Sequence, residues 1–198
     1  AAFGLGLLQH IDPARFETQS LVLCPTRELA DQVAGELRRL ARCLPNIKIL
    51  MLCGGQPFGA QRDSLQHAPH IIVATPGRLL DLEHQNAVSL DKVEILVLDE
   101  ADRMLDMGFL PAVTTIVDAT PADRQTLLFS ATIDHSIQKN LGSLLNDPAV
   151  VEIARNGETA QTVEQFMMPI ANFKKPELLQ ALLEEKGSDR VIVFARTK

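Results

Sequence analysis

The chain has 198 residues, of which 46% are hydrophobic and 22% are charged, an ordinary composition for a globular protein. No apolar stretch approaches the roughly 20 residues that a membrane-spanning helix needs, and the first residues lack the basic start of a secretory signal. The three cysteines, Cys24, Cys43 and Cys53, include no C-x-x-C pair, which favours reduced and mostly buried thiols. We therefore expect a cytoplasmic protein with one full domain plus a remainder and no membrane partner.

The charge balance limits how the chain could bind nucleic acid. The formal net charge is −6 and the isoelectric point about 5.4, whereas proteins that bind nucleic acid by bulk electrostatics usually have a basic domain. Aromatic residues are also scarce, with eight Phe but no Trp and no Tyr, so stacking on bases is poorly supplied. Any contact with nucleic acid must therefore be local, made by a few side chains and backbone amides.

Short apolar runs alternate with helical periods along most of the chain. This rhythm predicts an α/β fold, a doubly wound parallel sheet flanked by helices with right-handed crossovers. In chain order the expected elements are a helix over 1–9, a strand over 20–24, a helix with an apolar stripe from 29 to 44, a strand over 47–52, a helix over 57–66, a strand over 71–74, a short helix, a strand ending at 98, one helix, a strand over 126–129, a helix over 136–145 and a strand over 150–153.

A change of composition follows this alternation. Residues 154–162 are polar, include a glycine and lack an apolar period, which predicts a linker. Residues 163–198 contain an extended piece over 163–170, a helix over 176–185 and an apolar strand over 191–194, and 36 residues are too few to bury a core of their own. We expect three parts: a domain over 1–153, a linker over 154–162 and the beginning of a second α/β domain over 163–198.

Two adjacent carboxylates, Asp99 and Glu100, follow directly on the apolar run Ile95–Leu98. Ligands of open α/β sheets bind beyond the carboxyl ends of the strands, where this pair would lie. The first carboxylate could hold Mg²⁺ through water, and the second could orient or deprotonate an attacking water. The simpler interpretation is an acidic helix N-terminus, where Asp and Glu interact favourably with the helix dipole.

Other distinctive loops also follow the predicted strands. They are Pro25-Thr26-Arg27-Glu28-Leu29-Ala30, Gly54-Gly55, Thr75-Pro76-Gly77-Arg78, Asp99-Glu100-Ala101-Asp102 and Ser130-Ala131-Thr132. Together these loops resemble one family, the DEAD-box RNA-dependent ATPases, and 191–194 resembles the first strand motif of that family's second RecA-like domain. Residues 21–57 are similar to the bacterial DbpA type and residues 73–109 to the RhlE type.

The resemblance implies a RecA-like helicase domain that uses ATP and Mg²⁺. It implies that Asp99 coordinates the metal through water and that Glu100 is the catalytic base. A Glu that orients water is consistent with phosphoryl transfer, in which the protein mainly positions groups and stabilises charge. The residues implied to couple the ATP site to RNA are Asp102, Ser130, Ala131 and Thr132, since the two hydroxyls could hydrogen-bond the Asp102 carboxylate.

The remaining loops are implied to bind RNA. Glycines let a phosphate approach backbone amides, while hydroxyls, helix N-termini and Arg add donors and charge. Such contacts are sequence-independent, and ribosomal or messenger RNA–protein complexes are the expected partners. Taken singly, each loop could be an ordinary turn or a solvated helix start, but their position on one sheet edge favours the functional interpretation. The implied RNA-binding residues are Pro25, Thr26, Arg27, Gly54, Gly55, Thr75, Pro76, Gly77 and Arg78.

The sequence contains no G-x-x-x-x-G-K-[ST] phosphate loop. Its start, Ala1-Ala2-Phe3, is similar to the segment that follows this loop in DEAD-box proteins. We therefore expect a fragment of an ATP-dependent RNA helicase core that lacks the phosphate-loop strand. The sheet should have a groove where that strand is missing. The fragment alone should be inactive. The alternative is a non-catalytic RNA-binding or regulatory module with a degenerate helicase fold. A DNA-directed or translocating helicase is a weaker third interpretation.

Overall fold

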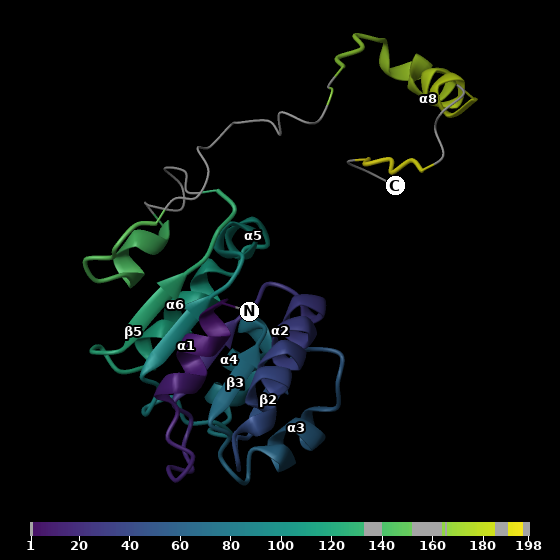
Figure 1. Ribbon diagram of the computed structural model, residues 1–198. Helices are drawn as coiled ribbons and strands as arrows, with labels where there is room; N and C mark the ends of the chain where they lie inside the picture. Colours follow the sequence, from purple (N-terminus) through teal and green to yellow (C-terminus); the bar gives the residue numbers. More distant parts are fainter. Residues whose placement is uncertain (1, 133–139, 152–163, 165, 185–189, 196–198) are drawn as a thin grey trace. The chain divides into compact units, whose positions relative to one another are not determined.

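The computed structural model describes residues 2–132, 140–151, 164, 166–184 and 190–195 (Figure 1). The chain divides into two compact units, Ala1–Asn156 and Gly157–Lys198. The boundary between the units falls among residues 154–162, the predicted linker, which lie outside the described residues. Each unit is considered by itself below.

A five-stranded parallel sheet forms the centre of the first unit. Its order, β2-β3-β1-β4-β5, places strands that are distant in sequence side by side, which requires crossover connections. The predicted doubly wound parallel sheet is confirmed. The strands are β1 (Ser20–Leu23), β2 (Ile49–Leu52), β3 (Ile71–Ala74), β4 (Ile95–Leu98) and β5 (Gln125–Leu128).

The apolar runs form strands because they are buried on both sides of the sheet. Every residue of β1, β3 and β4 is buried, whereas β2 and β5 at the edges are only partly buried. The expectation of a groove is wrong for the described strands, because β4 pairs directly with β1 and with β5. Within the described part of the chain, the outer sides of β2 and β5 form the two edges of the sheet.

Helices cover the sheet on both faces (Figure 1). One apolar cluster joins α1 and α2 to side chains such as Val22, and the other joins α4, α5 and α6 to side chains such as Leu21. Neighbouring strand residues point to opposite faces, so both clusters draw on the same strands. The helices are α1 (Ala2–His10), α2 (Arg27–Leu40), the 3₁₀ turn η1 (Ala41–Cys43), α3 (Phe58–Ser64), α4 (Pro76–His84), α5 (Ala101–Asp106) and α6 (Leu110–Asp118).

The prediction of one helix after the acidic pair is wrong, since α5 and α6 are separate helices. Gly108 lies between them with a φ of +74°. Glycine adopts this left-handed conformation without a steric penalty, so the chain can end one helix and begin the next. Met107 is the C-cap of α5, and Phe109 is the N-cap of α6.

The structure also differs from prediction towards the C-terminus. The predicted helix over 136–145 lies partly outside the described residues, and a 3₁₀ turn, η2 (Gly142–Leu144), ends its described part. Val150 and Val151, in the predicted strand over 150–153, are exposed and form no strand, and residues 152–153 are not described. Among the described residues, neither valine has a neighbouring strand with which to pair, and backbone pairing is what stabilises a strand.

The second unit contains one regular helix among its described residues. This is α8 (Lys175–Glu184), preceded by the 3₁₀ turn η3 (Asn172–Lys174). The predicted strand over 191–194 is wrong, because these residues form no strand and Phe194 is 92% exposed. The described residues of this unit bury no side chain fully, so nothing offsets the entropy of ordering a strand.

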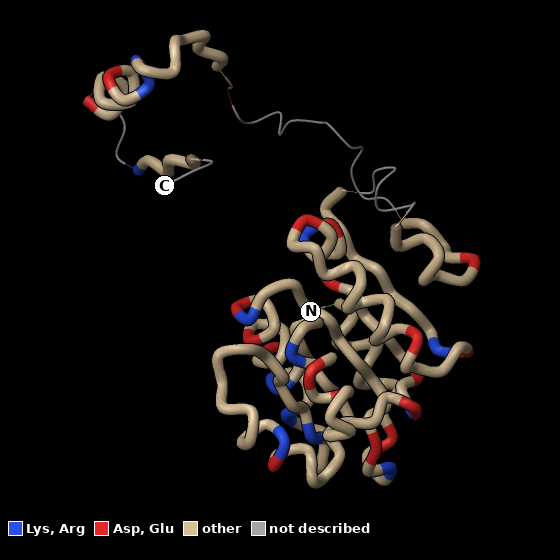
Figure 2. Tube along the Cα trace, turned by 180° about the vertical axis from the view of Figure 1, so that it is seen from behind, with Lys and Arg blue, Asp and Glu red and all other residues tan. Residues whose placement is uncertain are grey.

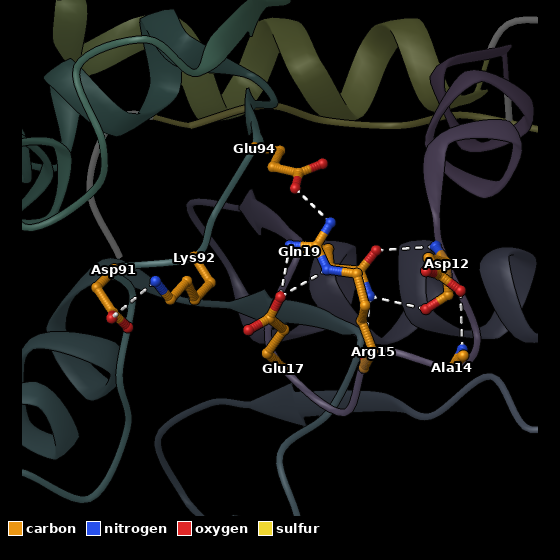
Figure 3. Close-up of polar contacts among 8 residues, drawn as sticks. All are labelled: Asp12, Ala14, Arg15, Glu17, Gln19, Asp91, Lys92 and Glu94. Atoms are coloured by element: carbon orange, nitrogen blue, oxygen red, sulfur yellow. Dashed lines mark hydrogen bonds and ion pairs between the residues drawn. The ribbon is translucent and has the colours of Figure 1, made fainter.

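At the amino edge of the sheet, the side chain of Gln19 organises the loop between α1 and β1 (Figure 3). Gln19 is 1% exposed. Its Oε1 accepts from the N–H of Asp12, and its Nε2 donates to the carbonyls of Asp12 and Arg15, each at 2.9 Å. The Arg15 guanidinium donates to Glu17 and to Glu94, which directly precedes β4. One buried amide thus replaces the regular backbone pairing that the loop lacks.

Gln19→Met should lower the free energy of unfolding of the first unit by about 1–3 kcal/mol, because three loop backbone groups lose their partner in a poorly hydrated place. Urea denaturation followed by circular dichroism measures the change. Gln9→Met, on the exposed side of α1, is the matched control and should stay within about 0.5 kcal/mol of the parent. An equal effect of the two substitutions would contradict the role given to Gln19.

Candidate functional site

The predicted site loops begin at one edge of the sheet, where each is tied to a neighbouring strand. The N–H of Cys24 donates to Ala74, that of Thr75 to Leu52, and that of Asp99 to Leu23, at 2.9–3.1 Å. Phe129 continues the pattern by donating to Leu98 at 2.8 Å. Because the strands are parallel, these residues lie at their carboxyl ends. The loops that follow them share the edge at which open α/β sheets bind ligands.

Asp99 is half-buried at the end of β4. Burial raises the pKa of its carboxyl group above the usual value, and the neighbouring charge of Glu100 raises this pKa further, although the N–H of Glu100 opposes the shift by hydrogen bonding. Asp99 also lines a cavity between α1 and α2, together with Phe3, Gly4 and Leu29. A cation in this place would offset the cost of ionising the buried carboxyl group.

Glu100 has an unusual backbone conformation. Its φ of +52° and ψ of +55° lie in the left-handed region, and every other described non-glycine residue with positive φ is Asn or Asp. A left-handed conformation costs a residue like Glu about 1–2 kcal/mol, and such strain concentrates at functional sites. The Arg103 guanidinium donates to Glu100 Oε2 at 3.2 Å in an ion pair that is exposed to solvent and therefore weak.

Asp102 connects α5 to the loop after β5. Its Oδ2 accepts from the N–H and from the hydroxyl of Thr132, at 3.2 and 3.1 Å, and its Oδ1 accepts from the N–H of Arg103 at 2.9 Å. Burial alone would raise the pKa of Asp102, but these hydrogen bonds outweigh it and lower the pKa. Ser130 donates its hydroxyl to the carbonyl of Thr132 at 2.6 Å, so the turn around Ala131 is closed on itself.

The residues at this end of the sheet suit Mg²⁺ only in a limited way. Among the described residues, no three His, Cys, Asp or Glu side chains are grouped as metal ligands. Asp99 therefore offers a single carboxylate. Mg²⁺ is commonly held by one or two carboxylates together with water and substrate phosphates, and one half-buried carboxylate fits that arrangement rather than a dedicated metal site.

The loop after β1 contacts the loop after β2. Thr26 is the N-cap of α2, and its Oγ1 accepts from the N–H of Leu29 at 3.3 Å. Arg27 follows, and its Nη1 lies 2.9 Å from the point where a side chain on Gly55 would begin. Gly55 has a φ of +78°, a conformation that favours glycine, and a side chain there would displace the end of Arg27. Pro25, which directly precedes Thr26 and Arg27, is buried.

Two other glycines of the predicted site face open space. A β-carbon added to Gly54 or to Gly77 would meet no atom within 4 Å. The fold itself therefore leaves room for a side chain at both positions. Gly77 lies in the first turn of α4, after the N-cap Thr75 and the N1 residue Pro76. Open space beside backbone amides leaves these groups accessible to a phosphate.

A polar cluster at this edge was not predicted from the sequence. Gln61 on α3 is 4% exposed and donates through Nε2 to the carbonyl of Cys53 at 2.8 Å. The Arg78 Nη1 donates to Gln61 Oε1 at 3.0 Å and to the Gln56 carbonyl at 3.1 Å, and its guanidinium lies 5.7 Å from the centre of the Phe58 ring. The sequence feature that could have indicated the burial of Gln61 is its spacing of three residues from Phe58, which places it on the apolar side of the helix.

Two of the cysteines lie at the same edge. Cys24 and Cys53 are buried, whereas Cys43 is exposed, so the expectation of mostly buried thiols is confirmed. Burial raises the pKa of the Cys24 thiol strongly, and burial also raises that of Cys53. Nucleophilic cysteines need a lowered pKa, and these two thiols are therefore structural.

Comparison with known proteins agrees with this arrangement. The family model described as DEAD/DEAH box helicase matches residues 1–140. Over all 198 residues the chain is 60% identical to the ATP-dependent RNA helicase DbpA of Escherichia coli, of which it covers 43%, and 41% identical to the ATP-dependent RNA helicase CshA of Listeria monocytogenes, of which it covers 38%. The chain thus spans less than half the length of these relatives. The similarity to DbpA extends beyond 21–57, while the similarity of 73–109 to the RhlE type stays a prediction.

Two solved structures show the same fold. The crystal structure of a DEAD box protein from Methanococcus jannaschii has a TM-score of 0.73 and 33% identity, covering 94% of this chain and 49% of that one. That of a hypothetical ATP-dependent RNA helicase from Sulfolobus tokodaii has a TM-score of 0.65 and 38% identity, covering 74% of this chain and 42% of that one. These similarities, with the parallel sheet, confirm the predicted RecA-like fold.

Thr132→Val should raise the pKa of Asp102 towards its ordinary value of about 3.9, because one donor to the carboxylate is lost. The depressed pKa of the parent contributes stability that is full above about pH 3.9 and is lost as the pH falls through the lower, folded-state pKa. A carbon-13 NMR titration of the Asp102 carboxyl group measures its pKa in the parent and in the variant. Thr115→Val, on an exposed position of α6, should leave the pKa of Asp102 unchanged. An unaltered pKa in Thr132→Val would contradict the contact.

Proposed function

Because the chain belongs to the DEAD/DEAH box helicase family, we propose that it supplies the catalytic carboxylates and the RNA-binding loops of an ATP-dependent RNA helicase. Hydrolysis of ATP would be coupled to local separation of RNA strands or to remodelling of RNA–protein complexes. The observation that carries the proposal is the position of five site loops on one sheet edge, with Asp102 in contact with Thr132 across two of them.

The charge of the first unit supports a division of this edge into two sides. Residues 27–78 contain seven Lys or Arg and four Asp or Glu, a formal net charge of +3. Residues 79–132 contain three and ten, a net charge of −7. Figure 2 shows the basic positions mainly on the side of α2 and α3 and the acidic ones mainly on the other side. A local positive field favours a phosphate backbone although the whole chain is acidic.

On the acidic side, Asp99 and Glu100 would act on the nucleotide. Asp99 would hold Mg²⁺ through water, and Mg²⁺ with ATP would supply a polarised γ-phosphate when bound. Glu100, whose backbone is left-handed and whose carboxylate contacts Arg103, would orient an attacking water and accept its proton. A carboxylate that is already in place needs no rearrangement during the reaction, which is the main way in which proteins accelerate phosphoryl transfer.

On the basic side, the loops would bind RNA through its phosphates. The Thr26 hydroxyl accepts from Leu29 and therefore keeps its hydrogen for a phosphate oxygen. The accessible backbone at Gly54 and Gly77 offers further donors, and Arg27 and Arg78 add positive charge. These groups would contact the backbone rather than base edges, so binding should be independent of sequence.

The loop around Ala131 would connect the two sides. Asp102 and Thr132 are joined by two hydrogen bonds, so a displacement of either residue would be passed to the other. Because Asp102 lies two residues after Glu100, a change at the nucleotide would reach the loop after β5. Ribosomal or messenger RNA–protein complexes stay the proposed partners, and a cytoplasmic location stays a prediction. No helix in the described part of the chain has the length and apolar composition needed to span a bilayer.

In a complete helicase carrying this sequence, Glu100→Gln should keep ATP and RNA binding but lower the rate of ATP hydrolysis by about 100-fold or more, because the amide cannot accept the proton of the attacking water. Single-turnover hydrolysis with saturating RNA measures the chemical step. Glu28→Gln, on the exposed first turn of α2, is the control. Hydrolysis within a few-fold of the parent would remove Glu100 from its proposed role, and RNA binding without any ATP hydrolysis by the parent would favour a non-catalytic module.

Gly54→Ala should weaken binding of single-stranded oligouridine by about tenfold, the scale of one lost hydrogen bond to a charged group, while leaving the fold intact because its β-carbon enters open space. Fluorescence anisotropy at low ionic strength measures the affinity. Gly35→Ala in the exposed side of α2 also enters open space and should leave RNA affinity unchanged. If both variants bind as the parent does, RNA does not approach Gly54.

A further inference from the structure

The side chain of Gln61 is a buried polar group to which the proposed reaction assigns no role. It projects from α3 and is 4% exposed, so it cannot itself contact a ligand at the surface. Its Nε2 donates to the Cys53 carbonyl at 2.8 Å and to Gln56 Oε1 at 3.2 Å. Cys53 directly precedes Gly54-Gly55, and Gln56 directly follows them. One amide group therefore holds both ends of the glycine loop.

Arg78 is bonded both to Gln61 and to Gln56 at the end of the glycine loop. Its Nη1 donates to Gln61 Oε1 at 3.0 Å and to the Gln56 carbonyl at 3.1 Å, and its guanidinium lies near the face of Phe58, 5.7 Å from the ring centre. Arg78 belongs to α4, which follows β3, whereas Gln61 and the glycine loop follow β2. The side chain of Gln61 thus connects the glycine loop after β2 to Arg78, which lies 17 residues after Gln61 in the sequence.

We propose that Gln61 is a positioning residue that fixes Arg78 and the Gly54-Gly55 loop in one arrangement for binding an RNA phosphate backbone. This inference rests on the proposed RNA-binding function of the two loops. Glycines give the loop conformational freedom, and a free arginine side chain has many rotamers. Gln61 removes both kinds of freedom before the ligand arrives, and such preorganisation increases affinity by lowering the entropy lost on binding.

The geometry leaves Arg78 able to bind a ligand. A guanidinium has five N–H donors, and the hydrogen bonds of Arg78 to described residues are made through Nη1. The remaining donors stay available for a phosphate, for which the planar guanidinium is well suited. Because Gln61 is neutral, it orients Arg78 without cancelling the charge of the guanidinium. A glutamate in its place would cancel that charge.

The test compares Gln61→Met with Gln66→Met. Methionine has nearly the size of glutamine but offers no amide, and Gln66 is exposed just beyond α3. Nitrogen-15 relaxation reports the mobility of the Gly54 and Gly55 amides without any RNA. We expect order parameters near 0.85 in the parent and in Gln66→Met, and values below about 0.6 in Gln61→Met, with β1, β3 and β4 unchanged. An unchanged loop in Gln61→Met would overturn the proposal.

RNA affinity supplies the second readout. Gln61→Met should weaken oligouridine binding by about tenfold and Arg78→Met by more, while the double variant should bind within twofold of Arg78→Met, because residues that act together are not additive. If the loss of affinity in the double variant equals the product of the two single losses, Gln61 acts apart from Arg78 and the proposal is overturned. If the parent binds no RNA, the proposed function fails, and the order parameters still decide whether Gln61 positions the loop.

If Gln61→Met does not fold, Gln61→Glu keeps an acceptor for Arg78 but places a carboxylate oxygen against the Cys53 carbonyl. The Gly54 and Gly55 order parameters should then fall, while the Arg78 Nε–H order parameter stays near its parent value because position 61 still offers an acceptor. Gly54 and Gly55 amides as rigid as in the parent would overturn the proposal.

Discussion

The matched ends of the parallel strands are the constraint on which the rest of the structure depends. Leu23 pairs with Ala74 on one side and with Leu98 on the other, Leu52 pairs with Ala74, and Leu98 pairs with Leu128. Each strand therefore ends at the same level. The residues that follow must leave the sheet together, because one further hydrogen bond, such as that from the Cys24 N–H to the Ala74 carbonyl, ends the ladder at this level. Burial of the strands on both faces enforces this register, since a slip of one residue would exchange the two sets of side chains.

Polar side chains then set the position of the loops that leave this edge. Asp102 holds the loop after β5, and Gln61 holds the loop after β2 through hydrogen bonds to its backbone and to Arg78. Gln19 does the same at the opposite edge. A buried amide has both donors and acceptors, so it can satisfy backbone groups that neither a helix nor a strand pairs. Hydrophobic packing positions the strands, whereas these side chains position the loops.

Much of the fold could be predicted because its signals are local. The runs at Ile71–Ala74 and Ile95–Leu98 are apolar on both faces, and their loops carry distinctive residues. The break at Gly108 was missed because a single glycine within a helical period does not reveal a positive φ. The strands over 150–153 and 191–194 were predicted from composition, but strands form by pairing, and the described residues provide Val150, Val151 and 191–194 with no partner. Gln61 was missed because burial of a polar residue depends on distant contacts.

The central claim is that RNA lies along the basic side of the carboxyl edge. Nitrogen-15 NMR of this chain titrated with single-stranded oligouridine, without nucleotide, tests it most directly. The account predicts the largest shifts at the amides of Gly54, Gly55 and Gly77 and at the Arg78 Nε–H, with the loop around Gln19 unaffected. Largest shifts at the C-terminal end of α2, around Arg38 and Arg39, would contradict it, because they would place RNA by charge alone, away from the loops that the sheet brings together.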